Sequence, residues 1–544
     1  MRNPEKNKSS FFIIGFTQSA FLTVISRISG FIRDIFIAGF LGAGIFSDIF
    51  LIAFKLPNLF RRITAEGALT SAFLPIYSKL KIQYGGFLAF IYFKKVFYRV
   101  VIALFILMII FQIIMPLLIH FLAPGFSNNE DVIKEITTLS RITIIFMPLI
   151  SIVALLGVAT NVSGKFWVLA FTPTILNSSI IIGCFLINDY WSIKSLPLAI
   201  AVVFGGLIQI IFILIMIKKY EIFDFKNLEE NGSDRSFNDQ IQFQLSQTWN
   251  KFLPAAFGGG ILQINLLVDT ILASLLGFGS ISYLYFADRI AQLPLGIIGI
   301  ALGTTLLTSL SKSNAIKDAN QFSKELIISF RIGLFFSIPA ALVFISFSDL
   351  LIKVLFERGE FGLQETTQTS HALIAYSIGV PAFIILKSCQ PAFLAEGNTK
   401  TPMYVGFMLL ILNIVLSIGL MIYLKHAGIA LATSLASWIG SIIYISLLIK
   451  NGKITKPIFS FEEKDTNLFL IILYGFKITL VSCLMILCMK YIQHVLEIYD
   501  TNEVFVLVIL CMFGFIMYIL TSKIFNYIPQ EISHFISFKF KKAK

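Results

Sequence analysis

Long apolar stretches recur along nearly the whole chain, and this pattern limits what the chain can fold into. Of its 544 residues, 57% are hydrophobic and only 13% are charged, whereas soluble domains are about 45–50% apolar and about 25% charged. A transmembrane helix needs about 20 consecutive, mostly apolar residues. The sequence therefore predicts an all-α polytopic membrane protein.

On that criterion the sequence predicts fourteen transmembrane helices. They are expected near residues 11–40, 45–77, 97–122, 135–160, 166–188, 195–217, 252–276, 281–310, 325–350, 367–395, 401–424, 428–449, 467–490 and 503–525. Lysine and arginine concentrate in the tails and in alternate loops, which places both termini in the cytoplasm by the positive-inside rule. The opposite side holds few basic residues: Lys134, Lys194, Lys353, Arg358, Lys425 and Lys490.

An internal repeat divides the chain. The segment "DIFIAGFLGAG" (34–44) resembles "DTILASLLGFG" (269–279), and "NVSGKFWVLAFTPTILN" (161–177) resembles "AEGNTKTPMYVGFMLLILN" (395–413). Each repeat unit covers six predicted helices in the same orientation, which is typical of transporters with a substrate site between two parallel lobes. We therefore expect a first lobe over 1–225, a second over 226–458, and two further helices with a basic tail over 459–544.

Several kinds of chemistry have no support in the sequence. The net charge of +13 is expected to report membrane orientation rather than nucleic-acid binding. The five cysteines lack the spacing of a disulfide framework or a metal site. Neither a phosphate-binding glycine loop nor a hydrolase nucleophile motif is present. We expect a transporter rather than an enzyme, without a metal or an organic cofactor.

Charged residues inside the first two predicted helices are the strongest functional signal. The segment "SRISGFIRD" (26–34) carries Arg27, Arg33 and Asp34 between apolar stretches, and Asp48 and Lys55 follow in the next helix. A charge at the bilayer centre costs about 2.5–3.5 kcal/mol on insertion scales, so these side chains must face a protein interior or a wet cavity. The spacing supports one face, because Arg27 and Asp34 lie seven residues apart.

Two interpretations of these charges remain open. They could form internal ion pairs that only join helices, or they could bind a ligand. Basic residues outnumber acidic ones here, and an excess of positive charge favours an anionic ligand such as phosphate, which arginine binds bidentately. The basic and acidic residues of this stretch are Arg27, Arg33, Lys55, Arg61, Arg62, Asp34, Asp48 and Glu66.

The second repeat unit carries a different polar set. It lacks the first unit's arginines but offers Asp288 and Arg289 in the segment 285–296. Asp269, Asn413, Ser417 and Thr433 supply hard oxygen atoms that suit a small monovalent cation or a proton. Hydrogen bonds between packed helices are the alternative explanation of this set.

Five segments of the sequence form a recognisable set. They are "SRISGFIRD" (26–34), "SDIFLIAFKLPNLFRRITAEGALTSAFLPIYSKL" (47–80), "LAPGF" (122–126), "YFADRIAQLPLGIIGIALGTTLLTSLSK" (285–312) and "ALIAYSIGV" (372–380). Together they resemble the MurJ (MviN) family of lipid II flippases, in the MOP exporter superfamily. The resemblance covers the chain to about residue 450 and is most specific over 42–80.

The resemblance implies lipid II as the substrate, in the bacterial inner membrane, moved by alternating access through a cationic cavity. It implies a hydrophobic groove on the last two helices for the lipid tail, membrane lipids around the protein, and cell-wall synthesis and division proteins as candidate partners. It assigns substrate binding to Arg27, Arg33, Asp34, Asp48, Lys55, Arg61, Glu66 and Arg289.

The resemblance also implies a coupling site at Asp269, Asn413 and Thr433 for Na⁺ or a proton, with the membrane potential as the other energy source. Two positions depart from the family pattern: Ser417 replaces an acidic ligand, and Gln292 stands where some members have glutamate.

The alternatives differ in the residues that they require. Another MOP exporter, such as a polysaccharide-lipid flippase or a drug antiporter, would share the fold, but a drug antiporter should have an acidic cavity. A membrane enzyme acting on polyprenyl phosphates would need clustered acidic residues or histidines, and a scaffold protein would need no charged interior.

Overall fold

The computed structural model describes residues 4–63, 69–188, 190–223, 235–454, 468–499 and 501–529. The described residues are almost entirely helical, and their only β-type pairing is the isolated bridge between Arg358 and Phe361. The all-α prediction is therefore confirmed. The chain divides into two compact units, of which the first comprises residues up to Ser282 together with Arg358–Phe361, and the second comprises the rest.

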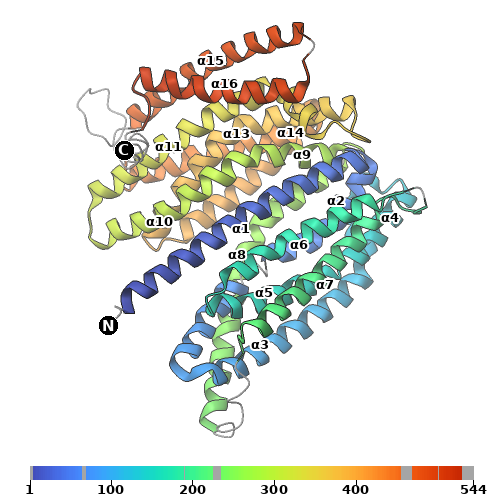
Figure 1. Ribbon diagram of the computed structural model, residues 1–544, viewed down its shortest axis with the longest axis vertical. Helices are drawn as coiled ribbons and strands as arrows, with labels where there is room; N and C mark the ends of the chain where they lie inside the picture. The colour runs from blue at the N-terminus through green and yellow to red at the C-terminus, as the bar shows by residue number, and fades with distance from the viewer. Residues whose placement is uncertain are drawn as a thin grey trace. The chain divides into compact units, whose positions relative to one another are not determined.

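The first unit is built from helices of both short and membrane-spanning length (Figure 1). In it α1 packs against α6, α6 against α7, and α3 against α5 and α8. Its elements are α1 Pro4–Leu41, α2 Ile45–Ile63, α3 Leu69–Leu122, η2 Pro124–Phe126, α4 Glu130–Thr143, α5 Phe146–Val162, α6 Phe166–Phe185, α7 Leu196–Lys219 and α8 Arg235–Ser274.

The second unit holds the remaining helices. In it α13 packs against α14, α10 and α11, and α11 also contacts α15. Its elements are α9 Ser280–Pro294, the π-helical turn η3 Leu295–Gly299, α10 Ile300–Ala315, α11 Ala319–Ser346, α12 Ser348–Phe356, α13 Leu363–Ala395, α14 Lys400–Lys450, α15 Leu468–Ile498 and α16 Glu503–Ile524. The first residues of α9, up to Ser282, group with the first unit.

The last two helices form a hairpin that is attached to α11 and α12 (Figure 1). The Tyr518 hydroxyl donates to the carbonyl oxygen of Phe335 on α11 at 2.5 Å. Lys353 on α12 forms an ion pair with Glu503 at the start of α16, and this hydrogen bond raises the pKa of the Lys353 ammonium. The hairpin is thus held to the rest of the second unit through both α11 and α12.

Nine described helical segments are long and apolar enough to cross a membrane. The number fourteen therefore stays a prediction, while the multi-pass class is established. On α3 a row of large apolar side chains faces outward, including Ile106, Ile113 and Leu117, which are 54%, 71% and 71% exposed. Such a surface is stable only against lipid.

Several predicted helix boundaries were wrong, each for a local reason. The predicted loop 78–96 is helical in α3 except at Gly85, which has φ 85° and ψ 175°. Predicted helix 281–310 is interrupted at Pro294, which has no N–H to donate and is followed by the π-helical turn. By contrast, the break predicted between helices 401–424 and 428–449 is confirmed, because the backbone of α14 is non-helical at Lys425.

Two other boundaries also differ. Predicted helix 135–160 is divided into α4 and α5, and predicted helix 45–77 is represented by α2, which contains Pro57, and by the start of α3. Helix α12 was not predicted. The compact units divide the chain near Ser282, whereas the repeat divides it at 225, so the repeat-based lobe boundaries stay a prediction.

Close helix packing depends on glycine at Gly183 on α6. A Cβ atom added there would lie 2.7 Å from the Ala201 Cβ of α7. We expect Gly183→Val to lower the thermal unfolding midpoint of the purified protein in detergent, because overpacking costs about 1–3 kcal/mol. Gly419→Val on α14 is the control, since nothing lies within 4 Å of that position. Equal midpoints for the two variants would contradict the packing argument.

Candidate functional site

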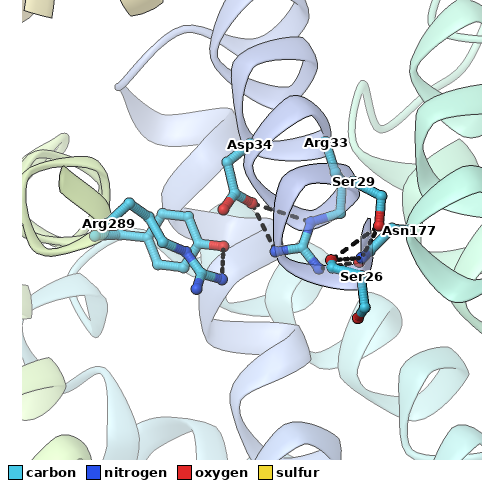
Figure 2. A network of polar contacts seen from close by, with 7 residues as sticks. Ser26, Ser29, Arg33, Asp34, Asn177 and Arg289 are labelled. Carbon is cyan, nitrogen blue, oxygen red and sulfur yellow. Dashed lines mark hydrogen bonds and ion pairs between the residues drawn. The ribbon is translucent and has the colours of Figure 1, made fainter. Parts of the chain in front are cut away.

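A buried polar network on α1 is the best-defined part of the candidate site (Figure 2). The Arg33 guanidinium donates from Nε and Nη2 to Asp34 Oδ1, at 3.0 and 2.6 Å. Arg33 is 8% exposed and Asp34 is fully buried. The two opposite charges thus balance each other, which a buried charge requires. This ion pair lies within α1, and the two interpretations of the charged set stay predictions.

Asn177 on α6 holds the same guanidinium from another side (Figure 2). Its Oδ1 accepts a hydrogen bond from Arg33 Nη1 at 3.0 Å. Its Nδ2 donates to the Ser26 carbonyl oxygen at 3.2 Å and to Ser29 Oγ at 2.9 Å. The amide therefore joins α1 to α6 and fixes the orientation of Arg33.

Asn177 was not predicted as a site residue. The signal was present in the sequence, because Asn177 ends the repeated segment 161–177 and its counterpart is Asn413. A polar residue that recurs at the same place in two apolar repeats indicates a similar hydrogen-bonding position in both. Its partner Arg33 lies 144 residues away, so only the fold reveals the contact.

The Asp48 carboxylate on α2 binds donors at the start of α9. It accepts hydrogen bonds from the Gly279 N–H at 2.6 Å, the Ser282 N–H at 2.8 Å and Ser282 Oγ at 2.5 Å. The residue is fully buried. A carboxylate at the first turn of α9 satisfies backbone donors that have no partner within the helix and interacts favourably with the helix dipole. Any part of Asp48 in substrate binding is therefore indirect in this conformation.

The other basic residues of the first unit lie in different surroundings. Arg27 on α1 is exposed, whereas Asp34 on the same helix is buried, so the two predicted neighbours have different environments. On α2, Arg61 Nε donates to Asn58 Oδ1 at 3.0 Å, and Arg62 Nη1 donates to Gln263 Oε1 at 3.4 Å. Lys55 on α2 is half-buried, and Glu66 lies outside the described residues.

In the second unit, Arg289 on α9 is half-buried and lies over the Tyr285 ring, 4.9 Å from its centroid. Arg289 Nη2 also donates to the Tyr285 hydroxyl at 2.9 Å (Figure 2). Stacking on an aromatic ring orients a guanidinium. Gln292, one of the departures from the family pattern, donates to Asp288 Oδ2.

The predicted cation site divides between the two units. Asn413 Nδ2 donates to Thr433 Oγ1 at 3.0 Å, and Ser417 Oγ lies 3.5 Å from Asn413 Oδ1. Asp269 belongs to the first unit, where Asn265 Nδ2 lies 3.5 Å from its Oδ2. Among the described residues, no group of three or more histidine, cysteine, aspartate or glutamate side chains could hold a metal ion.

Comparison of the sequence with known proteins identifies the family of this chain. The family model described as "Lipid II flippase MurJ" matches residues 37–507. The chain belongs to the MurJ family. The probable lipid II flippase MurJ of Rickettsia prowazekii (strain Madrid E) is 38% identical over 422 residues, covering 77% of this chain and 80% of that protein. The protein of the same description from Buchnera aphidicola subsp. Acyrthosiphon pisum (strain APS) is 32% identical over 522 residues, covering 93% and 97%.

Solved structures agree with the MurJ assignment. A structure titled "Lipid II flippase MurJ, inward closed conformation" has a TM-score of 0.73 at 28% identity, covering 93% of this chain and 98% of that chain. A multidrug resistance MATE family transporter of the MOP superfamily has a TM-score of 0.63 at 11% identity, covering 78% and 94%. At that identity the second likeness concerns the fold alone. The predicted resemblance to the MurJ family is confirmed.

Removing the amide of Asn177 should weaken the network. We expect Asn177→Ala to lower the thermal unfolding midpoint, because losing a partner of a buried charged donor costs about 1.5–3 kcal/mol. Asn188→Ala, at an exposed position after α6, is the matched control. If differential scanning fluorimetry shows no difference between the two variants, Asn177 does not hold α1 and α6 together.

Proposed function

We propose that the chain moves lipid II from the inner to the outer leaflet of the bacterial cytoplasmic membrane. Membership of the MurJ family over residues 37–507 is the observation that carries this proposal. The protein would act as a transporter without a chemical step on its substrate. The alternative, a different MOP exporter, is not favoured, because the MATE-like neighbours share only the fold.

Arginines on several helices would bind the pyrophosphate of lipid II. Arg33 is already balanced by Asp34, so its part is to hold α1 in shape rather than to provide free charge. Arg27, Arg61 and Arg289 are the proposed direct contacts, with Lys55 in support on α2. Guanidinium forks match phosphate oxygens, and charge-assisted hydrogen bonds of this kind are roughly twice as strong as neutral ones.

The lipid tail needs an apolar surface that the headgroup site does not supply. The α15–α16 hairpin offers one, because large apolar side chains are exposed along both helices. They include Phe476, Leu480, Leu487, Phe505, Val508, Met512 and Phe515. Within the bilayer a polyprenyl chain would pack on such a surface through van der Waals contacts, whereas the headgroup would remain with the basic residues.

A coupled cation is the proposed energy source, with the membrane potential as a second contribution. Within the first repeat the Arg33 guanidinium lies between Asp34 and Asn177. The equivalent positions of the second repeat are Val268, Asp269 and Asn413, so the aspartate and asparagine recur with valine in place of the arginine. The proposed ligand of this second set is a Na⁺ ion or a proton. One charge crossing 100 mV yields about 2.3 kcal/mol.

Removal of the proposed contacts should abolish activity without unfolding the protein. In cells depleted of their own flippase, Arg27→Ala and Arg289→Ala should lower lipid II translocation at least about tenfold, since each charge-assisted bond contributes about 1.5–3 kcal/mol. Arg141→Ala is the control, because this exposed arginine donates to a backbone carbonyl of α3 at 3.2 Å. Normal growth and translocation with both variants, at normal expression, would show that these arginines do not bind the substrate.

The coupling proposal has a separate test. In proteoliposomes, Asp269→Ala should remove the response of lipid II translocation to an imposed Na⁺ or pH gradient, because the variant lacks the cation's charged ligand. Asp239→Ala, near the start of α8, is the control. An Asp269→Ala protein that still responds to the gradient would exclude this residue from coupling.

A further inference from the structure

Lys387 is a single charge within the apolar part of α13. From Ala372 to Ala395 this helix carries no other charged side chain. Lys387 is exposed, whereas its neighbours Ser388 and Cys389 are buried. Among the described residues, none forms an ion pair or a hydrogen bond with its ammonium. A charge in a membrane helix is costly unless it meets water or an opposite charge, so this side chain needs a water-filled recess or an anionic ligand.

The internal repeat shows that the architecture of this helix does not require the lysine. Helix α13 leads into the repeated segment 395–413, and α5 leads into its counterpart 161–177. The sequence of α5, from Phe146 to Val162, contains no charged residue. The corresponding helix of the first repeat is therefore built without a cation. Lys387 is a feature of the second repeat alone, as expected of a residue that serves one asymmetric ligand.

The backbone next to Lys387 is irregular and carries two glycines. Pro294 ends α9, and the π-helical turn η3 follows over Leu295–Gly299. A Cβ atom at Gly299 would lie 3.7 Å from Lys387 Cγ, and one at Gly303 would lie 3.7 Å from the Lys387 carbonyl oxygen. Any longer side chain at Gly299 would thus cover the lysine stem. Helical turns of this π type frequently occur at functional sites.

Arg289 lies on the same stretch of chain, ten residues before Gly299, and both cations belong to the second unit. At a rise of 1.5 Å per residue, the arginine and the lysine are about 15 Å apart along this stretch. One pyrophosphate cannot reach both. The two cations also differ in kind, because arginine offers a planar fork that matches phosphate, whereas lysine is a compact point charge. Lys387 therefore suits a second anionic group of the same ligand.

We propose that Lys387 binds a carboxylate of the peptide part of lipid II while Arg289 contacts the pyrophosphate. The proposal rests on the transport function proposed above. A peptide spans at most about 3.3–3.6 Å per residue, so roughly four or five extended residues cover the distance between the two cations. An ammonium and a carboxylate form a charge-assisted hydrogen bond, which an uncharged amide does not match. Lys387 thus makes the site selective for a peptide with unmodified carboxylates.

A binding comparison tests this assignment. Purified protein would be titrated with lipid II and with lipid II whose peptide carboxylates have been converted to amides. The unsubstituted protein should bind the amidated lipid at least fivefold more weakly. Lys387→Met keeps the length of the side chain and removes its charge, so it should weaken lipid II binding at least fivefold and leave the affinity for the amidated lipid unchanged. Lys450→Met, at an exposed position at the end of α14, is the matched control.

The outcomes separate this proposal from the transport function. Arg289→Ala should weaken binding of both lipids by the same factor, because both carry the pyrophosphate. An equal loss for both lipids with Lys387→Met, or no loss for either, would overturn the role of Lys387. Failure of the proposed function would instead appear as absence of binding to both lipids by the unsubstituted protein.

A second measurement does not depend on lipid II. With the native cysteines replaced, Lys387→Cys would be treated with a negatively charged, membrane-impermeant methanethiosulfonate in detergent-free membranes opened to both sides. It should react at least tenfold faster than Ser388→Cys, because Ser388 is fully buried and its hydroxyl donates to the Ile384 carbonyl oxygen at 3.2 Å. Equal rates would overturn the proposal, since the side chain at 387 would then not meet a water-filled recess.

Discussion

Burial of charge in an apolar protein is the constraint on which the rest of the structure depends. Arg33 and Asp34 are both buried in α1, and each would be too costly without the other. The Asn177 amide satisfies the guanidinium from α6 and also binds the backbone of α1 at Ser26. The need to satisfy one ion pair therefore contributes to the position of α1 against α6.

The two repeats solve the same problem in different ways. The first carries its own cation, because Arg33 lies between an aspartate and an asparagine. The second keeps Asp269 and Asn413 but has Val268 in place of the arginine. This difference agrees with a scaffold-forming role for the first set, and it is the basis of the proposal that the second set binds an exchangeable cation.

The sequence was sufficient for properties that depend on local composition, and insufficient for those that depend on distant contacts. Apolar periodicity predicted the all-α class and most helices, and the charges in 26–34 identified α1. It did not reveal the Asp48 contact, because the Ser282 donors lie 234 residues away. Nor did it reveal that most of 78–96 is helical, because local polarity does not decide where a helix ends.

Recognition of pyrophosphate by the basic side chains is tested most directly by a binding comparison. Purified protein would be titrated with lipid II and with an analogue that carries a monophosphate in place of the pyrophosphate. We expect the analogue to bind at least tenfold more weakly, and Arg27→Ala largely to remove this difference. Equal affinity of the unsubstituted protein for the two lipids would contradict pyrophosphate recognition.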